Sequence, residues 1–530
     1  MPEDCSAYAN STFFTPLIHD YLLEKESIRT LYNRFPNLEN FKAQLDEKAA
    51  NYPAHFREVL ANSLDAQYQN ITISAETKRN LAQLRESTTF TITTGHQLNI
   101  GTGPLYFVYK IITTINLCNQ LKQTYPDKNF VPVYWMATED HDLAEINHVY
   151  VKNKKVIWEK QGNGAVGRMD TQGMDKVIDQ IKLLLGNSIA SQEMLALFSE
   201  SYLTSKSLAE ATRKLVNSLF GRYGLVIVDG DSRELKTVFT PYIQNELTTQ
   251  FSYTEVSSTI AAMNTYKIQV NPREINLFFI ENNLRERIVF ENNRYKVLNT
   301  RLEFSADEIK QLAANEPEKF SPNVLLRPLY QEVILPNLCY IGGGGELAYW
   351  LELNSMFAKA QVTFPVLLLR NSVVIASNKT KAKWEKTPLV WEDLFLTPKE
   401  LIAAFISKTT SNTVDFTDIK QQLANQFTAM HEQAKATHPS FLNMLKAQEA
   451  KQMKGLLALE KRLHKAHTKA QQENIDRILS IQNDVFPGQK LAERTVNISE
   501  YYSLLGHGFI DELLAKLDPL KPKFTCLFFD

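Results

Sequence analysis

The segment TITTGHQLNIGTGPLYFVYKIITTINLCNQL, residues 91–121, contains a β-branched run, a glycine-bearing loop and a helical pattern in succession. Residues 90–94 are apolar or β-branched and predict a short buried strand. The chain then breaks at Gly95. Pro104 suits the first turn of a helix, because its missing N–H would be unpaired there in any case. Residues 105–123 carry the apolar face of a buried helix.

The loop between this strand and this helix is a candidate anion site. Free backbone N–H groups and the positive end of a helix dipole attract negative charge at such a place. The spacing matches neither G-x-G-x-x-G nor G-x-x-x-x-G-K-[ST], so a turn that only reverses the chain is the alternative. The candidate binding residues are Gly95, Gln97, Gly101, Thr102, Gly103 and Tyr106, and His96 is a candidate catalytic residue.

The composition indicates a globular protein of several domains. The chain has 530 residues, of which 44% are hydrophobic and 22% are charged. Its 58 lysines and arginines balance 59 aspartates and glutamates, which argues against a nucleic-acid partner. No apolar run approaches the length of a bilayer span, and residues 1–10 lack the pattern of a signal peptide. A cytoplasmic location is expected.

The cysteines support the same location. Cys5, Cys118, Cys339 and Cys526 are scattered, and none of them forms a C-x-x-C pair. We expect four free thiols in a reducing compartment, and neither a disulfide framework nor a zinc site.

A second predicted buried strand, residues 130–136, ends in the densest polar cluster of the sequence. Ligands of open α/β sheets bind at the carboxyl ends of the strands. We therefore expect this cluster and the loop after the first strand to face one crevice. The candidate catalytic residues are Glu139, Asp140, His141 and Asp142, and the candidate binding residues are Asn147 and His148.

Four interpretations of this cluster stay open. Carboxylates beside a histidine suit a divalent metal ion. A histidine flanked by carboxylates also suits general acid–base catalysis. The carboxylates could instead hold a substrate ammonium group or sugar hydroxyls. In the fourth interpretation, Asp140 or Asp142 caps a helix and His141 is a polar surface residue.

Four consecutive glycines, residues 342–345, separate another predicted strand from a helix. Glycine is costly to order, so the run indicates a partner that approaches the backbone closely; a tight strand-to-helix turn is the alternative. Residues 364–370 predict the last core strand. The candidate binding residues of this region are Arg327, Glu332, Gly342, Gly343, Gly345, Glu346, Trp350 and Arg370.

The alternation of strands and helices predicts an α/β class with insertions and a helical region. Residues 150–159 predict a hairpin, residues 177–201 and 500–517 a helix each, and residues 524–529 a strand. Residues 415–480 predict two long helices that meet near Pro439 and form a coiled coil. The predicted parts are 1–149, N-terminal helices and the first half of the core; 150–200, a connecting insertion; 201–249, the core continued; 250–320, a β-rich connecting insertion; 321–395, the second half of the core; 396–486, the coiled coil; and 487–530, a segment that returns to the core.

Several of these motifs occur together in one order. They are Gly95-His-Gln with Thr102-Gly-Pro-Leu-Tyr, Glu139-Asp-His-Asp with Glu145-Ile-Asn-His, Arg327-Pro-Leu with Gln331-Glu, and Ile341-Gly-Gly before Tyr349-Trp-Leu-Glu. In this order they resemble the bacillithiol-biosynthesis cysteine-adding enzymes over essentially the whole chain. The resemblance implies a Rossmann-like core related to class I aminoacyl-tRNA synthetases, connecting insertions, and a C-terminal α-helical coiled coil that forms a homodimer. The chain departs from the family at His96, where the family has glutamine.

The resemblance also implies a reaction. It is the last step of bacillithiol biosynthesis, in which L-cysteine is joined to glucosaminyl-malate by an amide bond through an activated carboxylate. ATP with Mg is the expected cofactor. No zinc is expected, because no cysteine–histidine ligand set stands out. Two other classes stay open: another nucleotide-dependent transferase on the same core, and a non-catalytic nucleotide-binding coiled-coil scaffold.

Overall fold

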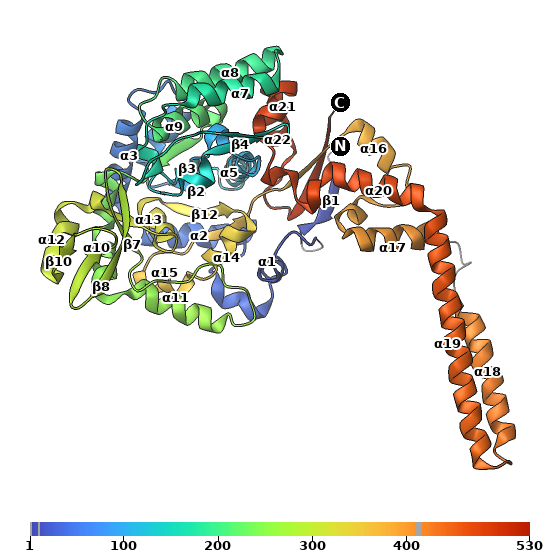
Figure 1. The fold of residues 1–530 in the computed structure, drawn as a ribbon. Helices are drawn as coiled ribbons and strands as arrows, with labels where there is room; N and C mark the ends of the chain where they lie inside the picture. Colours follow the sequence, from blue (N-terminus) through green and yellow to red (C-terminus); the bar gives the residue numbers. More distant parts are fainter. Residues whose placement is uncertain (1–2, 9–10, 410–415, 530) are drawn as a thin grey trace. The chain divides into compact units, whose positions relative to one another are not determined.

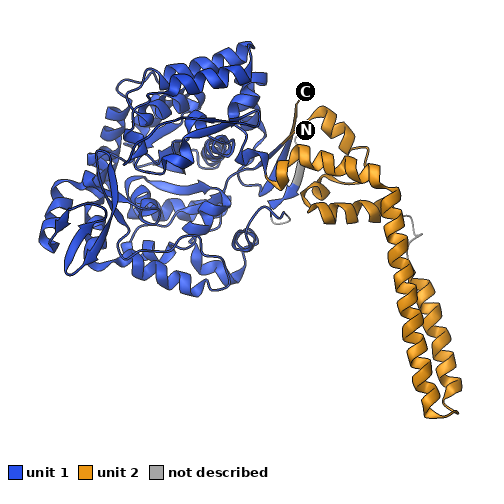
Figure 2. Cartoon of the chain, viewed as in Figure 1, with its two compact units in different colours: residues 1–374, 491–526 blue, residues 375–490, 527–530 orange. Residues whose placement is uncertain are grey.

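The computed structural model describes residues 3–8, 11–409 and 416–529 (Figure 1). The chain divides into two compact units (Figure 2). Unit 1 contains residues 1–374 and 491–526, and unit 2 contains residues 375–490 and 527–530. Residues 375–395, which the sequence placed in the core, therefore fall in unit 2.

A five-stranded parallel sheet forms the centre of unit 1, in the order β13-β12-β2-β3-β6. Almost every residue of these strands is buried, which explains their apolar and β-branched composition, because helices cover both faces of such a sheet. The predicted α/β core is confirmed. The strands are β2 (Thr89–His96), β3 (Asn129–Met136), β6 (Val226–Asp229), β12 (Asn337–Gly342) and β13 (Val366–Leu369).

Helices α2 (Leu38–Asn51) and α5 (Tyr106–Thr124) contribute to one apolar core with these strands. The core includes Phe41, Leu45, Phe90, Ile92, Leu117, Leu121, Leu338, Ile341, Val366 and Leu368. Helix α5 begins two residues after the predicted Pro104, and the Leu105 N–H just before it donates to the Val496 carbonyl at 2.8 Å. Other helices of unit 1 are α1 (Pro16–Leu22), α3 (Ala54–Tyr68), α4 (Ala75–Gln83), α6 (Leu143–Ile146), α9 (Leu208–Phe220), α10 (Arg233–Thr249), α13 (Leu326–Ile334), α14 (Gly344–Trp350) and α15 (Asn354–Ala360).

Two insertions interrupt the alternation. The first contains the predicted hairpin β4 (His148–Val151) and β5 (Lys154–Ile157), followed by α7 (Met174–Leu185) and α8 (Ile189–Tyr202). The single helix predicted there is wrong, because Gly186 has φ 83° and ends α7. The second insertion is an antiparallel sheet in the order β10-β9-β8-β7-β11, with two helices. Its elements are α11 (Phe251–Ala262), β7 (Leu277–Glu281), β8 (Leu284–Glu291), β9 (Arg294–Val297), β10 (Glu303–Phe304), α12 (Ala306–Asn315) and β11 (Phe320–Pro322).

Unit 2 is helical. Its elements are α16 (Asn378–Trp384), α17 (Pro398–Thr409), α18 (Thr417–Ala434), α19 (Pro439–Ala470) and α20 (Gln472–Val485). Helices α18 and α19 form a hairpin around Phe427, Ala434 and Leu445, with an ion pair of 2.6 Å between Lys420 and Glu460. The predicted start of a helix at Pro439 is confirmed. The prediction of only two helices is wrong, because the chain breaks again at Gln471.

The C-terminal segment of unit 1 contains α21 (Ile498–Leu505), α22 (Gly508–Lys516) and the start of β15 (Lys523–Phe529), which pairs with β1 (Glu3–Ala7). Gly506, at φ 58°, divides the single helix that was predicted here. Cys118 and Cys339 are buried free thiols, but Cys526 is disulfide-bonded, so the prediction of four free thiols is wrong. No helix in the described ranges is long and apolar enough to cross a membrane.

Candidate active site

The site lies where the strand order changes direction. The chain runs from β2 outward to β3 and β6, and then returns to the other side of β2 with β12 and β13. In such sheets the ligand crevice opens beyond the carboxyl ends of the two strands at this switch. A Cβ atom at Gly95, near the end of β2, would be 3.2 Å from the Tyr340 hydroxyl and 3.4 Å from Arg327 Nη1. Glycine thus lets Arg327 and Tyr340 approach the strand end.

A buried ion pair crosses the switch point. Lys110 Nζ, on α5, is 2.5 Å from Glu346 Oε2 on α14 and donates to the Gly95 carbonyl at 2.9 Å. Glu346 also accepts hydrogen bonds from the Tyr340 hydroxyl at 2.8 Å and the Gly343 N–H at 2.9 Å. Burial opposes ionisation, but Lys110 and these donors outweigh it and lower the pKa of Glu346. Glu346 is therefore an anion that its own protein already neutralises.

Arg327, on α13, differs from Lys110 because it has no counter-ion. It is half-buried and donates to the Gln331 side chain and to the Tyr349 hydroxyl, each at 3.1 Å. Its guanidinium carbon lies 5.9 Å from the centre of the Tyr340 ring. It makes no ion pair within the described part of the chain. A planar cation held by neutral partners is well suited to bind a carboxylate or phosphate of a ligand.

Arg370, just after β13, is neutralised internally. Its Nη2 is 2.6 Å from Glu493 Oε1, and its Nη1 donates to the Ser372 hydroxyl at 3.1 Å. Its Nε has no hydrogen-bond partner among the described residues, and a Cβ atom at Gly343 would be 3.8 Å from it. The guanidinium carbon also lies 5.6 Å from the centre of the Tyr106 ring. One N–H of Arg370 thus has no partner among the described residues, but it is inaccessible to solvent next to the glycine run.

The glycines of the run differ in their surroundings. A Cβ atom at Gly342 would come within 2.8 Å of Leu347 Cδ1, so close internal packing favours glycine there. A Cβ atom at Gly345 would have no neighbour within 4 Å. The tight-turn interpretation therefore applies at Gly342, and the close approach of a partner to the backbone stays a prediction.

His96, the last residue of β2, is packed between aromatic rings. Its ring stacks on Phe107 with a centroid distance of 5.0 Å and meets the edge of Tyr106 at 5.3 Å. Burial, together with the positive charges of Lys110 and Arg370, lowers the pKa of His96 well below its ordinary value. The ring is therefore neutral at physiological pH.

The loop after His96 does not present free N–H groups as predicted. The Gly101 N–H donates to the Tyr202 hydroxyl at 2.8 Å, and the Gly103 N–H donates to the Ile100 carbonyl at 3.0 Å. The Asn497 side chain donates to the carbonyls of Gly101 and Gly103, at 2.7 and 2.6 Å. The prediction of an anion cradle from Gly101 to Gly103 is therefore wrong at these groups, because Tyr202 and the Ile100 carbonyl already accept their N–H bonds.

Gln97 joins this loop to the polar cluster after β3. Its side-chain amide donates to Asp140 Oδ2 and to Glu145 Oε2, each at 2.7 Å. The backbone continues the connection, because the Ala137 N–H donates to the His96 carbonyl at 3.0 Å. The loop and the polar cluster are therefore in contact, and that they face one crevice stays a prediction.

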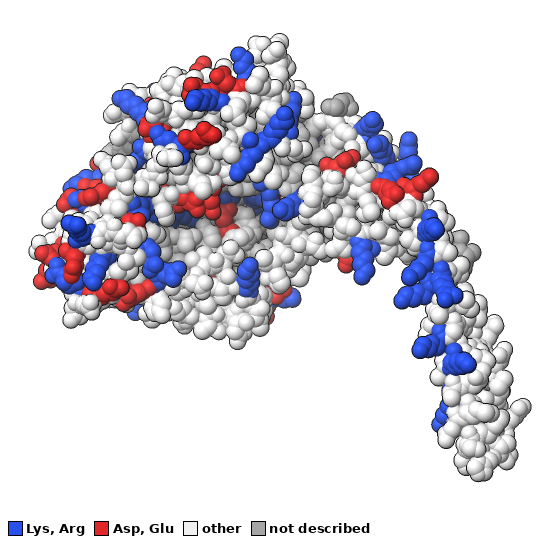
Figure 3. Space-filling view, in the orientation of Figure 1, with Lys and Arg blue, Asp and Glu red and all other residues white. Residues whose placement is uncertain are grey.

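Glu139 belongs to a buried charge network. Lys236 Nζ, on α10, lies 2.6 Å from Glu139 Oε1 and 3.5 Å from Asp231 Oδ1. Arg168 forms a two-pronged contact with Asp231, at 2.7 and 2.8 Å. Burial raises the pKa of Glu139, against the attraction of Lys236. In the space-filling view, acidic and basic side chains lie together in a hollow of unit 1 (Figure 3).

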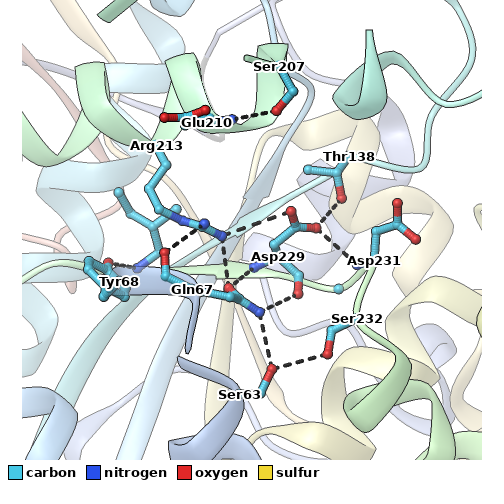
Figure 4. A network of polar contacts seen from close by, with 12 residues as sticks. Ser63, Gln67, Tyr68, Thr138, Ser207, Glu210, Arg213, Asp229, Asp231 and Ser232 are labelled. Atoms are coloured by element: carbon cyan, nitrogen blue, oxygen red, sulfur yellow. Dashed lines mark hydrogen bonds and ion pairs between the residues drawn. The ribbon is translucent and has the colours of Figure 1, made fainter. Parts of the chain in front are cut away.

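A second layer of polar contacts supports this network at the end of β6 (Figure 4). Asp229 accepts hydrogen bonds from the Thr138 hydroxyl at 2.5 Å and from the Asp231 N–H at 2.9 Å. Gln67 bonds both the N–H and the carbonyl of Asp229, each at 3.0 Å. Arg213 lies 3.9 Å from the same carboxylate. These contacts fix the strand ends from which Glu139 and Asp231 project.

His141 is held by an arginine. Arg285 Nη1, from β8, lies 2.7 Å from His141 Nδ1, and the Arg285 guanidinium carbon lies 4.0 Å from the centre of the Phe278 ring. Because arginine is only a donor, Nδ1 accepts this bond and Nε2 carries the proton of the neutral ring. Burial, followed by Arg285, lowers the pKa of His141. His141 therefore cannot take a proton without losing its contact with Arg285.

The other candidates lie outside this constellation. Asp142 caps α6 by accepting from the Glu145 N–H at 3.2 Å, which is the helix-cap interpretation. Asn147 and His148 contact each other at 3.3 Å at the base of the β4–β5 hairpin. Glu332 lies in the interior, with its Oε2 3.4 Å from Lys48 Nζ. Trp350 is fully buried, and its ring stacks on Tyr340 with a centroid distance of 4.4 Å. These positions do not bring the five side chains to the crevice.

Sequence reasoning missed four functional residues: Lys110, Lys236, Arg285 and Tyr340. A weak signal existed for the two lysines, because each interrupts an apolar helical face, and a buried lysine is almost always paired. No signal marked Arg285 or Tyr340, since their roles depend on which strands become neighbours. No group of three or more His, Cys, Asp or Glu side chains in the described ranges is arranged to hold a metal ion.

Comparison with known proteins identifies the family. The description "Bacillithiol biosynthesis BshC, N-terminal Rossmann-like domain" matches residues 1–371, and "Bacillithiol biosynthesis BshC, C-terminal coiled-coil domain" matches residues 373–529. Proteins named "Putative cysteine ligase BshC" are similar over their full length. The one from Flavobacterium johnsoniae is 51% identical and covers 99% of this chain and 100% of its own. The one from Christiangramia forsetii is 46% identical, and the match covers 100% of this chain and 99% of the relative.

A solved structure titled as a "putative arginyl t-RNA synthetase" from Campylobacter jejuni covers 83% of this chain and 98% of its own, at 11% identity and a TM-score of 0.19. That score is too low to support a common fold, so the relation to synthetases stays a prediction. The two family models, in contrast, span nearly the whole chain and agree with the parallel sheet of unit 1 and the helical hairpin of unit 2. This chain therefore belongs to the bacillithiol biosynthesis BshC family.

Proposed function

We propose that this enzyme catalyses the last step of bacillithiol biosynthesis, joining L-cysteine to the amine of glucosaminyl-malate. We place the reaction in the crevice beyond the carboxyl ends of β2 and β12. Family membership and the relatives named as cysteine ligases support the reaction class. The observation that carries the assignment to this crevice is the unpaired guanidinium of Arg327, because a half-buried cation without a counter-ion needs an anionic partner.

The two sides of the crevice differ in charge. Beyond β2 and β12, Arg327 offers donors to a phosphate or carboxylate, whereas the unpaired N–H of Arg370 beside it is inaccessible to solvent. Beyond β3, Asp140 has no lysine or arginine ion pair within the described residues, and its carboxylate holds only the Gln97 amide and a backbone N–H. An anion on the first side and an ammonium or amine on the second fit this distribution.

The reaction needs an activated acid. In the proposed activation, the carboxylate of cysteine would attack a phosphorus of ATP, the P–O bond to the departing diphosphate or ADP would break, and the new C–O–P bond would make the carbonyl carbon electrophilic. The amine nitrogen of the second substrate would then attack this carbon, the C–O bond to phosphate would break, and the amine would lose a proton. ATP with Mg is the proposed cofactor, with Arg327 as the donor to phosphate or carboxylate oxygens and Arg370 beside it. Holding both substrates together supplies a large part of the rate enhancement.

We also propose that the active form is a homodimer formed through unit 2. The α18–α19 hairpin buries Phe427, Ala434 and Leu445 between its own helices. It nevertheless leaves large apolar side chains exposed, which is unfavourable unless a second surface covers them. A second copy of the same hairpin is the occupant that we propose, because two such faces complement each other in a coiled coil. The exposed residues are Ile419, Met430, Phe441, Met444, Leu457, Leu459 and Leu463.

The test is to incubate purified protein with glucosaminyl-malate, cysteine and Mg-ATP and to detect the thiol product by mass spectrometry. Product should form only when cysteine and ATP are both present. Product without ATP would refute the proposed activation. ATP turnover without incorporation of cysteine would favour another transferase, and folded protein without any turnover would favour the scaffold alternative.

A further inference from the structure

A small cavity lies behind His96, enclosed by β2, the loop after it, and α9. It has a volume of about 10 Å³, which is the size needed for about one water molecule. The residues around it come from elements that are distant in sequence, and several of them are polar. The lining consists of His96, Gln97, Asn99, Thr102, Phe107, Tyr134, Tyr202, Thr212, Leu215 and Val216.

Four polar atoms of these lining residues are inaccessible to solvent and have no hydrogen-bond partner among the described residues. They are His96 Nε2, Asn99 Oδ1, Thr102 Oγ1 and Thr212 Oγ1. Asn99 is 9% exposed, and Thr102 and Thr212 are each 5% exposed. Each such atom costs about 1–3 kcal/mol if it stays unpaired. Four around one cavity are far more than packing alone would leave together.

The backbone supports the same conclusion. Thr102 has φ 72°, in the left-handed region that a β-branched residue rarely adopts. Gly101 and Gly103 on either side also have positive φ, at 58° and 67°, but of these three residues only Thr102 carries a β-branched side chain. The strained residue is one of those whose hydroxyl is unpaired in the cavity, so the strain coincides with a polar group that needs a partner.

We infer that one ordered water molecule occupies this cavity and holds His96 as the tautomer with its proton on Nε2. A water molecule donates two hydrogen bonds and accepts two. Asn99 Oδ1 can only accept, so one water hydrogen is directed to it. The threonine hydroxyls can donate or accept. Because each threonine hydroxyl can take either role, His96 Nε2 can complete the set as donor or as acceptor. We assign Nε2–H as the donor to the water oxygen, which leaves the less enclosed Nδ1 as the acceptor.

This assignment gives His96 a defined role. Nδ1 is not enclosed like Nε2 and has no described partner. With the proton fixed on Nε2, the lone pair on Nδ1 is free to accept a hydrogen bond at the crevice. Because the ring stays neutral, His96 acts as an acceptor that orients a donor such as the attacking amine, and it does not store the proton. This role, unlike the water site, rests on the proposed function.

A neutron crystal structure of the protein without substrates tests the water and the tautomer directly. We expect one D₂O molecule in the cavity and deuterium on Nε2 of His96 but not on Nδ1. An empty cavity, a metal ion in it, or deuterium on Nδ1 would overturn the inference. Neither result depends on the identity of the reaction.

Two variants sharpen this test in X-ray structures at high resolution. Thr212→Val removes one hydroxyl while keeping the shape, and we expect the water to be lost or displaced. The matched control is Thr114→Val, because Thr114 is buried but already bonded to the Lys110 carbonyl at 2.8 Å. The control should keep the water. A fully occupied, unmoved water in Thr212→Val would exclude Thr212 as a partner.

The role of His96 is tested by the pH profile of kcat/KM. His96→Gln keeps a donor and an acceptor, and we expect it to retain activity within about tenfold of the native enzyme with an unchanged profile. His96→Leu removes both and should lose about 10- to 100-fold more. If the native profile contains a limb near pH 6–7 that both variants abolish, His96 titrates in turnover and the proposed acceptor role is wrong.

Discussion

Replacing Arg327 with glutamine tests the proposed active site most directly. The substitution removes a charge that makes no direct ion pair within the described residues, and the partners it leaves, Gln331 and Tyr349, are neutral. No buried charge is left unpaired, so the fold should survive with a loss of only about 1 kcal/mol in the free energy of unfolding. A hydrogen bond to a charged group contributes about 1.5–3 kcal/mol. One lost bond to an anionic substrate therefore predicts a fall in kcat/KM of about 10- to 150-fold.

The assay is product formation under subsaturating substrate, with Arg294→Gln as the control. Arg294 is 43% exposed and pairs with Glu303 at 2.7 Å in the antiparallel insertion, so its loss should leave kcat/KM unchanged. A rise in KM for ATP would indicate that Arg327 binds phosphate, and an effect that vanishes with a substrate lacking malate would indicate a carboxylate. A change below about threefold in folded Arg327→Gln would refute the reasoning, because it would show that no anion contacts this guanidinium.

Three further predictions concern stability, pH and assembly. Lys236→Met should lower the free energy of unfolding by about 3–5 kcal/mol, because it leaves Glu139 and Asp231 without their shared cation. Calorimetry measures this loss. The control Lys42→Met should show a far smaller effect, because the ion pair of Lys42 lies at the surface. Burial raises the pKa of Glu352 to about 7, so the native state favours its protonated form and loses that stabilisation as the pH rises from 5 to 8. Glutamine at position 352 cannot ionise and can still accept from the Gln269 N–H. We therefore expect the melting temperature of Glu352→Gln, minus that of the native protein, to increase as the pH rises over this range. A difference that stays constant with pH would contradict the assignment. Leu459→Glu with Leu463→Glu should convert the dimer to monomer in sedimentation, whereas an unchanged mass would refute the proposed interface.

The sequence predicted the core of the fold because local patterns determine it. The β-branched run before Gly95 and the apolar run of residues 130–136 became the adjacent strands β2 and β3. Errors came where a single glycine acted on a long helical pattern. Gly186 and Gly506 each ended a helix that periodicity alone would have continued. A helical pattern records which face is apolar, but it does not record where the backbone adopts positive φ.

The site was less predictable, because its chemistry depends on contacts between distant segments. The loop after β2 had the pattern of an anion cradle, but the hydroxyl of Tyr202, about a hundred positions later, accepts the Gly101 N–H. His141 looked like a base until Arg285 was found on its Nδ1. In both cases the residue type predicted a function, and a partner from a distant segment of the chain occupies the group on which that prediction depended.

The balance of charges around the crevice finally constrains what can bind there. Lys110 is balanced by Glu346, and Arg370 by Glu493, so neither contributes a free charge. Among the described residues of this region, Arg327, beyond β2 and β12, makes no ion pair, and Asp140 and Glu145, which share the Gln97 amide beyond β3, have no lysine or arginine ion pair. A ligand that carries an anion at one end and an amine at the other would have a partner on each side, and a neutral ligand would have none. The proposed joining of an activated carboxylate to an amine fits this distribution of charge.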